Sequence, residues 1–321
     1  MRFFVTGVGG QLGHDVMNEV FRRGHEGIGS DIQPEYAGIQ DGSAVTQMPY
    51  VQLDITDRGA VERVVTAAKP DAVIHCAAWT AVDLAEEPEN EERVRAINAG
   101  GTLNIARVCR ALDCKMTYLS TDYVFDGQGT APWKPDCTDF HPLNVYGLTK
   151  LEGEQAVRQT ITKYFIVRIA WVFGVSGKNF IRTMVNLGRT RDEVRVVCDQ
   201  IGTPTYTRDL ARLLADMNET EKYGVYHATN EGGYISWYDF AVEIFRQAGL
   251  TTRVLPVTTQ EYGLSRAARP ANSRLDRSKL TEAGFEPLPP WQDALARYLQ
   301  ESRSLKRGNG NGTDSGDPDA D

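Results

Sequence analysis

In the first half of the chain, short runs of apolar and β-branched residues alternate with longer segments whose apolar positions recur at helical spacing. This alternation is typical of a parallel β-sheet whose strands are joined by crossover helices. We expect helices to begin near Gln11, Arg58, Glu87 and Tyr146. We expect strands over Arg2 to Thr6, Gly27 to Asp31, Tyr50 to Leu53, Asp71 to Cys76, Lys115 to Ser120 and Tyr164 to Ile169. The pattern therefore predicts an α/β fold with a doubly wound parallel sheet.

The alternation becomes irregular after Trp171, which indicates a second, smaller α/β domain. We expect helices from about Asn179, Thr207 and Ser236, strands over Val194 to Cys198 and Val225 to Ala228, and a last amphipathic helix over Trp291 to Leu299. Domains are predicted over residues 1–170 and 171–302, with a strand near 224–229 returning to the first. Residues 303–321 are rich in Gly, Asn and Asp, and we expect them to form a disordered acidic tail.

Composition excludes several classes of partner and location. The 35 basic and 43 acidic residues give a net charge of −8, which argues against an electrostatic grip on nucleic acid or on an anionic membrane. The longest apolar stretches, such as Ala72 to Val82, are too short to span a bilayer, and the chain enters its first strand without an apolar leader. These features predict a cytoplasmic protein.

Neither the cysteines nor the histidines have the spacing of a disulfide framework or a metal site. The five cysteines form no CxxC pair, so we expect free thiols in a reducing compartment. The five histidines lack metal-ligand spacing, and His75 lies on an apolar strand, where a hydrogen-bonded core histidine is expected. The sequence therefore predicts no metal site.

A glycine-rich turn follows the first strand and opens the first helix. Gly7, Gly10 and Gly13 lie in TGVGGQLG, where glycine lets the backbone approach a pyrophosphate and the helix N-terminus attracts it. Asp31 ends the second strand, where a carboxylate can accept hydrogen bonds from the adenosine ribose and repel a 2′-phosphate. The pattern favours a dinucleotide, with a preference for NADH over NADPH. The alternatives are a strand-to-helix turn of another α/β protein and a merely solvated Asp31.

The carboxyl ends of the third and fourth strands are expected at the same edge of the sheet. Asp54 follows the third strand, and Ala77 and Ala78 follow the fourth. Small side chains there would leave room for a dinucleotide, although strand-end packing explains the two alanines equally well.

A phenol and an ammonium lie four residues apart on one helix face, at Tyr146 and Lys150. The fifth strand delivers Thr121 to the same edge of the sheet. A carbonyl that accepts hydride develops alkoxide charge, which Tyr146 could neutralise as the proton donor. Lys150 would lower the pKa of the phenol and hold the nicotinamide ribose, and Thr121 would polarise the carbonyl. Each residue also has a plain structural explanation, as a packing tyrosine, a surface lysine and a strand cap.

Longer stretches of sequence resemble the extended short-chain dehydrogenase/reductase family, and within it the reductases of dTDP-4-dehydro sugars. The resemblance covers nearly the whole chain. It is carried by TGVGGQLG, CAAWTAVDLAEEP (76–88), STDYVFDG (120–127), VYGLTKLEGE (145–154), RIAWVFG (168–174), KNFIRTM (178–184), VVCDQIGTPT (196–205), SWYDFA (236–241) and RPANSRLD (269–276).

The resemblance implies a Rossmann dinucleotide domain followed by a substrate domain, and reduction of the 4-keto group of dTDP-4-dehydro-β-L-rhamnose by NADPH or NADH to give dTDP-L-rhamnose. Some members of the family use Mg²⁺ at a dimer contact, which this sequence does not support, and a monomer and a homodimer both stay open. The implied catalytic residues are Thr121, Asp122, Tyr146 and Lys150. The implied cofactor set adds Gln11, Leu12, Ile55, Trp79 and Thr80 to the residues above, and the implied substrate set is Thr80, Val82, Thr121, Asp122, Tyr123, Tyr146, Trp171, Asn179, Gln200 and Arg269.

Three other functions stay open on sequence alone. A sugar-nucleotide dehydratase is disfavoured, because Tyr123 stands where those enzymes have a glutamate. A reductase or epimerase of another nucleotide sugar would have the same central residues. A non-catalytic, dinucleotide-binding regulatory subunit is the third alternative, since fold alone does not determine function.

Overall fold

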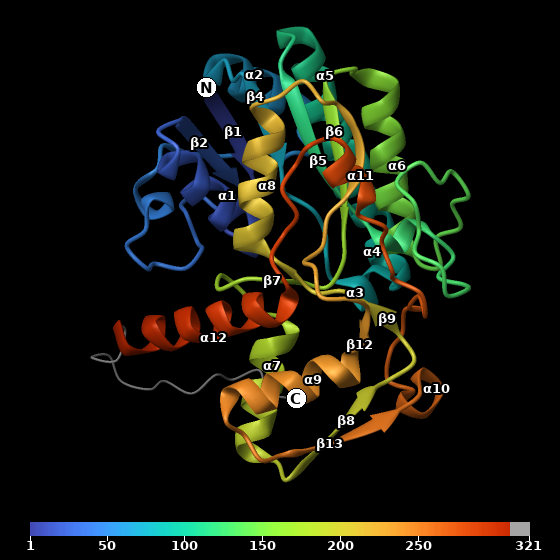
Figure 1. Cartoon of the computed structure of the whole chain (residues 1–321). Coiled ribbons are helices and arrows are strands. Elements are labelled where there is room, and N and C mark those ends of the chain that lie inside the picture. Colours follow the sequence, from blue (N-terminus) through green and yellow to red (C-terminus); the bar gives the residue numbers. More distant parts are fainter. Residues whose placement is uncertain (309–321) are drawn as a thin grey trace.

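The computed structural model describes residues 1–308 and has a seven-stranded parallel sheet with a smaller α/β half beyond the carboxyl ends of its strands (Figure 1). The strand order is β11-β6-β5-β4-β1-β2-β3, so the chain starts in the middle of the sheet and winds outward in both directions. The strands are β1 (Arg2–Thr6), β2 (Glu26–Asp31), β3 (Tyr50–Gln52), β4 (Ala72–His75), β5 (Lys115–Thr121), β6 (Tyr164–Ile169) and β11 (Gly224–His227). The predicted doubly wound α/β fold is confirmed.

Helices cover both faces of this sheet, which explains why its strands are apolar along their whole length. On β1, Phe3 and Val5 pack toward α1 (Gln11–Arg22) and α8 (Thr207–Asn218), whereas Phe4 packs toward the opposite face. That opposite face is covered by α2 (Arg58–Ala68), α5 (Thr102–Leu112) and α6 (Val145–Thr160). The two apolar layers fix the positions at which the strand ends emerge.

The helix expected from Glu87 is interrupted. A short helix, α3 (Val82–Ala85), precedes α4 (Pro88–Arg95), and a π-helical turn over Ala96–Gly101 joins α4 to α5. Two glycines at the end of this turn are poor helix formers, and π-turns are frequent at functional sites. Inside the turn, Asn98 accepts a hydrogen bond from the Trp79 backbone N–H at 2.9 Å, so the distortion fixes the segment that follows β4.

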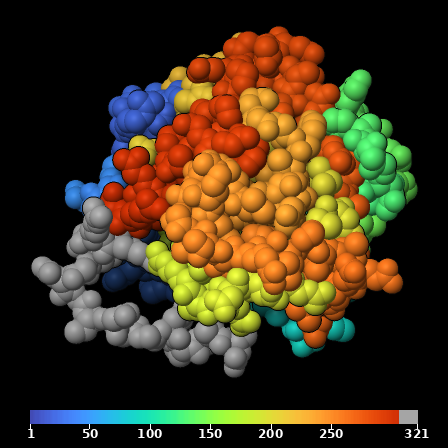
Figure 2. Space-filling model, turned by 60° about the horizontal axis from the view of Figure 1, so that its bottom comes forward, coloured from blue at the N-terminus to red at the C-terminus, as the bar shows by residue number. Residues whose placement is uncertain are grey.

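The second half is built on three two-stranded ladders and a separate aromatic core. Phe173, Tyr206, Phe240, Trp291 and Tyr298 are among the buried residues of that core. The ladders pair β7 (Val172–Phe173) with β10 (Thr205–Tyr206), β9 (Ile201–Gly202) with β12 (Ile235–Ser236), and β8 (Glu193–Val197) with β13 (Arg253–Val257). The helices of this half are α7 (Phe180–Thr190), α9 (Trp237–Ala248), α10 (Thr259–Tyr262) and α12 (Trp291–Gly308), and the face in Figure 2 is formed mainly by this half.

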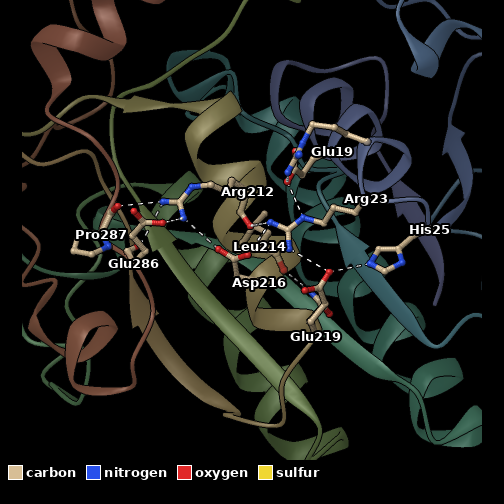
Figure 3. A network of polar contacts seen from close by, with 11 residues as sticks. Glu19, Arg23, His25, Arg212, Leu214, Asp216, Glu219, Glu286 and Pro287 are labelled. Carbon is tan, nitrogen blue, oxygen red and sulfur yellow. Dashed lines mark hydrogen bonds and ion pairs between the residues drawn. The ribbon is translucent and has the colours of Figure 1, made fainter.

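Three segments after residue 170 belong to the sheet rather than to the second half. Strand β11 pairs in parallel with β6 at the sheet edge. Helix α8 was expected from about Thr207 but not at the sheet, and it packs beside α1. Helix α11 (Ser278–Glu282) packs beside β11. A polar network on the α1–α8 contact joins Arg23 to Asp216 at 2.7 Å and to Glu219 at 3.1 Å, and joins Arg212 to Glu286 at 3.1 Å (Figure 3).

The last helix is longer than expected. The sequence predicts that the tail begins at residue 303, whereas α12 continues to Gly308. Leu305 packs against the core of the second half, which gives the last helical turns a reason to form. The remaining residues, 309–321, lie outside the described part of the chain. No helix within residues 1–308 is long and apolar enough to cross a membrane. All five cysteines are free thiols, as the sequence predicts.

A buried ion pair anchors α6 to the sheet. The Arg168 guanidinium on β6 donates to both carboxylate oxygens of Glu154 on α6, at 2.7 Å each, and both side chains are almost fully buried. The rings of Phe125 and Phe140 cover the guanidinium from the loop after β5. Since α6 carries Tyr146 and Lys150, this pair also sets where these two side chains lie.

Replacing Glu154 by Gln should lower the free energy of unfolding by about 3–5 kcal/mol, because it leaves a buried guanidinium without a counter-charge. Urea unfolding followed by circular dichroism measures the loss. Glu152→Gln on the same helix is the matched control: its partner is the half-exposed Arg95 at 3.1 Å, so it should cost no more than about 1 kcal/mol. Equal losses in the two variants would contradict the anchoring role.

Candidate active site

A cavity of about 950 Å³ opens where the carboxyl ends of the sheet strands meet the second half. This is the edge at which open α/β sheets bind ligands. The volume lies at the upper end of the range for small-molecule sites, which is enough for a large ligand or for two ligands side by side. Eighteen of the residues expected at the site line it: Gly7, Gly10, Gln11, Leu12, Gly13, Asp31, Asp54, Ile55, Ala77, Ala78, Thr80, Val82, Thr121, Asp122, Tyr123, Tyr146, Lys150 and Trp171.

The glycine turn leaves one end of the cavity open to an anion. Helix α1 begins after Gly10 with no side chain capping its free N–H groups, so these groups and the positive end of the helix face the cavity. Gly7 has a φ of +70°, and a Cβ there would lie 2.7 Å from the Ala77 nitrogen. A Cβ on Gly13 would lie 2.2 Å from the Gly7 carbonyl oxygen. The turn thus requires glycine and has the form of a pyrophosphate cradle.

Asp31 lies beside this turn. Its carboxylate accepts hydrogen bonds from the Gly9 N–H at 3.0 Å and from the Ile32 N–H at 2.8 Å. Asp54, at the end of the next strand, accepts from the Thr56 N–H at 2.8 Å. Both carboxylates border the cavity where the adenosine part of a dinucleotide would lie on this fold.

His75 is a hydrogen-bonded core residue, as the sequence predicts. Its Nδ1 lies 2.8 Å from the Thr6 hydroxyl and its Nε2 lies 3.2 Å from the Thr102 hydroxyl. Burial lowers its pKa to about 3, so the ring is neutral. Within residues 1–308, no three His, Cys, Asp or Glu side chains gather as a metal site would require.

The first two turns of α6 place Tyr146 and Lys150 at the cavity. Asn144 caps the helix by accepting from the Gly147 N–H at 2.8 Å, and it also donates to the Ala268 carbonyl of the second half at 2.8 Å. The Tyr146 ring meets the Tyr123 ring edge-on, with centroids 5.7 Å apart. The Lys150 ammonium lies 4.3 Å from the centre of the Tyr118 ring.

The electrostatics of this pair differ from the sequence expectation. Burial raises the pKa of Tyr146, with a further increase from the Asp122 carboxylate and an opposing effect of the Thr121 hydroxyl. Burial lowers the pKa of Lys150 to about 7, against an opposing effect of Glu154. Desolvation therefore outweighs the expected lowering of the phenol pKa by Lys150, and Tyr146 holds its proton in the protein alone. A protonated phenol is the form that can act as an acid.

Next to this pair, Thr121 and Asp122 are buried at the end of β5. The Thr121 hydroxyl donates to Asp122 Oδ1 at 3.0 Å and accepts from the Tyr123 N–H at 3.2 Å. Burial raises the pKa of Asp122 to about 6. Within the described chain, the second carboxylate oxygen of Asp122 and the Ser120 hydroxyl have no hydrogen-bond partner. Both residues line the cavity, although the two unpartnered atoms themselves are buried.

The opposite wall of the cavity is aromatic. Trp171 stacks on Trp237 with ring centroids 3.8 Å apart, and Phe180 lies 4.6 Å from Trp237. Trp171 has a φ of +50°, a conformation that costs about 1–3 kcal/mol for a residue with a side chain. Trp171, one of the implied substrate residues, faces the cavity.

Four expected site residues do not line the cavity. Trp79 donates its indole N–H to the Ala81 carbonyl at 3.0 Å, and Gln200 donates to the Thr259 hydroxyl at 3.0 Å. Asn179 caps α7 and donates to Gln11 Oε1 at 3.0 Å. Arg269 pairs with Asp83 at 2.6 Å and donates to the Tyr123 hydroxyl at 3.2 Å. Asn179 and Arg269 thus hold residues that line the cavity.

Other lining residues were absent from the sequence prediction. Arg93 reaches the cavity from α4, and Ser176, Lys178, Phe180 and Trp237 reach it from the second half. The motifs KNFIRTM and SWYDFA contain three of these residues, but neither motif shows which of its side chains faces a ligand.

A parallel sheet with an uncapped glycine turn, a carboxylate beside that turn and a Thr-Tyr-Lys set in one cavity is the architecture of a dinucleotide-dependent oxidoreductase. The glycine cradle fits a dinucleotide pyrophosphate, and Asp31, Tyr146 and Lys150 stand where they could hold its riboses. The chain belongs to the RmlD substrate binding domain family, which matches residues 1–304.

Three relatives illustrate the similarity. The dTDP-4-dehydrorhamnose reductase of Streptomyces griseus is 41% identical over 303 residues, which cover 92% of this chain and 91% of that protein. The dTDP-4-keto-6-deoxy-D-glucose reductase of Streptomyces niveus is 37% identical over 298 residues, covering 92% of this chain and 96% of that protein. The crystal structure of the Bacillus anthracis dTDP-4-dehydrorhamnose reductase in complex with NADP superposes with a TM-score of 0.84 at 38% identity, covering 94% of this chain and 99% of that one.

The buried Lys150 should cost stability in the dinucleotide-free protein. Its pKa is about 7 when folded, below the ordinary 10.5, so between these pH values the unfolded chain binds the extra proton. The penalty is therefore complete below pH 7 and disappears as the pH approaches 10.5. Lys150→Met should raise the free energy of unfolding by on the order of a few kcal/mol at pH 6, with a gain that shrinks as the pH rises.

Urea unfolding at pH 6, 8 and 9.5 measures this gain. The exposed Lys134 provides the control, because Lys134→Met should leave stability unchanged at every pH. A Lys150→Met variant less stable than the parent at pH 6 would show that the ammonium is not a buried charge.

Proposed function

We propose that the protein reduces the 4-keto group of dTDP-4-dehydro-β-L-rhamnose to dTDP-L-rhamnose, with NADPH or NADH as the reductant. The observation that carries this proposal is the position of Thr121, Tyr146 and Lys150 in one cavity with the uncapped N-terminus of α1. A ketone between these groups and a dinucleotide would be reduced by hydride and proton transfer. The names of the full-length relatives support this chemistry.

Tyr146, Lys150 and Thr121 have different roles in this reduction. When bound, the reduced nicotinamide supplies hydride to C4 of the sugar. Tyr146 Oη gives its proton to the developing O4 alkoxide, which becomes the hydroxyl of the product. The protonated Lys150 Nζ stabilises the resulting phenolate, and the Thr121 hydroxyl positions O4. The aromatic wall excludes water, so that these interactions act in a medium of low dielectric constant.

The orientation of Thr121 matters for this role. Its hydroxyl donates to Asp122 in the protein alone, so it must turn from the carboxylate to donate to a ketone oxygen. A protonated Asp122 would leave the hydroxyl free to turn, and the raised pKa of this buried group, about 6, favours that form at mildly acidic pH.

A 4-keto sugar of different configuration is the second candidate substrate. The Streptomyces niveus relative is named for dTDP-4-keto-6-deoxy-D-glucose, and both sugars present the same ketone to the same three residues. The assay therefore offers both sugar nucleotides with each coenzyme and identifies the product. Turnover of the rhamnose precursor to dTDP-L-rhamnose supports the proposal. Coenzyme binding without turnover of either sugar would favour a regulatory, non-catalytic protein.

Tyr146→Phe should lower kcat by about 10²–10⁴-fold and leave the Kd of the coenzyme within about threefold, because it removes only the proton donor. Stopped-flow turnover and coenzyme titration measure the two effects. Tyr164→Phe, on β6 and outside the cavity, is the control and should retain full activity. Near-normal turnover by Tyr146→Phe would remove this residue from the mechanism.

Asp31→Asn should shift the ratio of kcat/KM for NADPH to that for NADH by at least about tenfold toward NADPH, relative to the parent. The substitution removes a negative charge beside the ribose and keeps an acceptor for the Gly9 N–H. Asp54→Asn, at the next strand end, should leave the coenzyme ratio unchanged. The ratio of kcat/KM for the two coenzymes is the readout. An unchanged ratio in Asp31→Asn would mean that this carboxylate does not face the 2′ position.

A further inference from the structure

A segment of the second half, residues 174–179, lies directly on the glycine turn of the first half. Gln11 Oε1 accepts hydrogen bonds from the Gly174 N–H at 2.9 Å and from the Asn179 side chain at 3.0 Å. The Ser176 hydroxyl donates to the Gly9 carbonyl at 3.3 Å. Three hydrogen bonds therefore fix this segment against the backbone that is expected to cradle the pyrophosphate.

Lys178 is the cation that this segment carries to the cavity. Gly177, with a φ of +99°, turns the chain so that Lys178 follows at the cavity wall. Lys178 is exposed, and no carboxylate or carbonyl of residues 1–308 pairs with its ammonium group. Its neighbours Ser176 and Asn179 are bonded to the turn, so the position of its backbone is well defined although its side chain is free.

Within residues 1–308, the other cations on α1 or at the cavity are engaged with protein groups. Arg22 and Arg23 lie at the C-terminal end of α1 and pair with Glu19 at 2.6 and 2.7 Å. Of the other cations that line the cavity, Lys150 is buried over a tyrosine ring and Arg93 lies 5.6 Å from the centre of the Trp79 ring.

A dinucleotide pyrophosphate carries two negative charges, and NADPH adds a 2′-phosphate. The helix end supplies only about half a positive charge, and Asp31 adds a negative one. The phosphate end of the cavity therefore lacks positive charge unless Lys178 supplies it.

We propose that Lys178, supplied by the second half of the chain, binds a phosphate of the dinucleotide and so completes the coenzyme site. This inference rests on the proposed function only in taking the coenzyme to be a dinucleotide. It also explains how a chain with a carboxylate at the ribose end could accept NADPH, because the ammonium would offset the charge of Asp31. Since the segment is already bound to Gln11, the coenzyme would contact both halves of the chain without a change in their arrangement.

Calorimetric titration of the intact protein with NADPH and, separately, with NADH tests the proposal without any turnover. Lys178→Met should raise the Kd of NADPH by about 10–100-fold, the usual effect of losing a charge-assisted hydrogen bond. Lys178→Arg should stay within about threefold of the parent. The salt dependence of the NADPH Kd should weaken in Lys178→Met, because one ion pair no longer contributes. Arg189→Met, an exposed position further along α7 and outside the cavity, is the control and should bind as the parent does.

The two coenzymes identify the phosphate. A weaker Kd for NADPH alone assigns Lys178 to the 2′-phosphate, and an equal weakening for both assigns it to the pyrophosphate. Unchanged Kd values for both coenzymes would overturn the proposal, as would a loss of dTDP binding with normal coenzyme binding. If the parent protein binds neither coenzyme, the proposed function fails together with this inference. If the parent binds the coenzymes and Lys178→Met binds them equally well, the role of Lys178 is refuted but the proposed function is not.

Discussion

The cavity depends on the contact of the Gln11 side chain with the second half of the chain. Its amide oxygen accepts from the backbone at Gly174 and from the cap of α7, so one group joins the glycine turn to the segment that bears Lys178. The parallel sheet alone would present the turn, the two carboxylates and the Thr-Tyr-Lys set on an open edge. With the second half in place, that edge becomes an enclosed site in which charges interact strongly.

Several groups at this site are buried at a cost to stability. Lys150 loses its hydration beneath Tyr118, Asp122 retains an unpartnered oxygen, and Trp171 adopts a positive φ. Their surroundings compensate through the Arg168–Glu154 pair and the aromatic core of the second half. This division is expected of an active site, where strained and desolvated groups persist because the rest of the fold holds them.

Sequence patterns predicted the parts that depend on local spacing. The strands β1 and β6 have the predicted bounds, because continuous apolar runs define buried parallel strands. The glycine triplet and the Tyr146–Lys150 spacing likewise identified the two ends of the cavity. The two-residue strands such as β9 and β12 were missed, since two residues show no periodicity. Lys178 and Trp237 were also missed, because only tertiary packing brings them to the cavity. The protonation of Tyr146 follows from its burial, which spacing does not reveal.

In the proposed reaction, C4 of the nucleotide sugar receives its hydride from a coenzyme bound in this cavity. The most direct test is to supply coenzyme deuterated at the reactive carbon of the nicotinamide and to locate the label in the sugar product by NMR. We expect one deuterium at C4 of the product. A product without deuterium at C4, or with deuterium at another carbon, would contradict the proposed reaction.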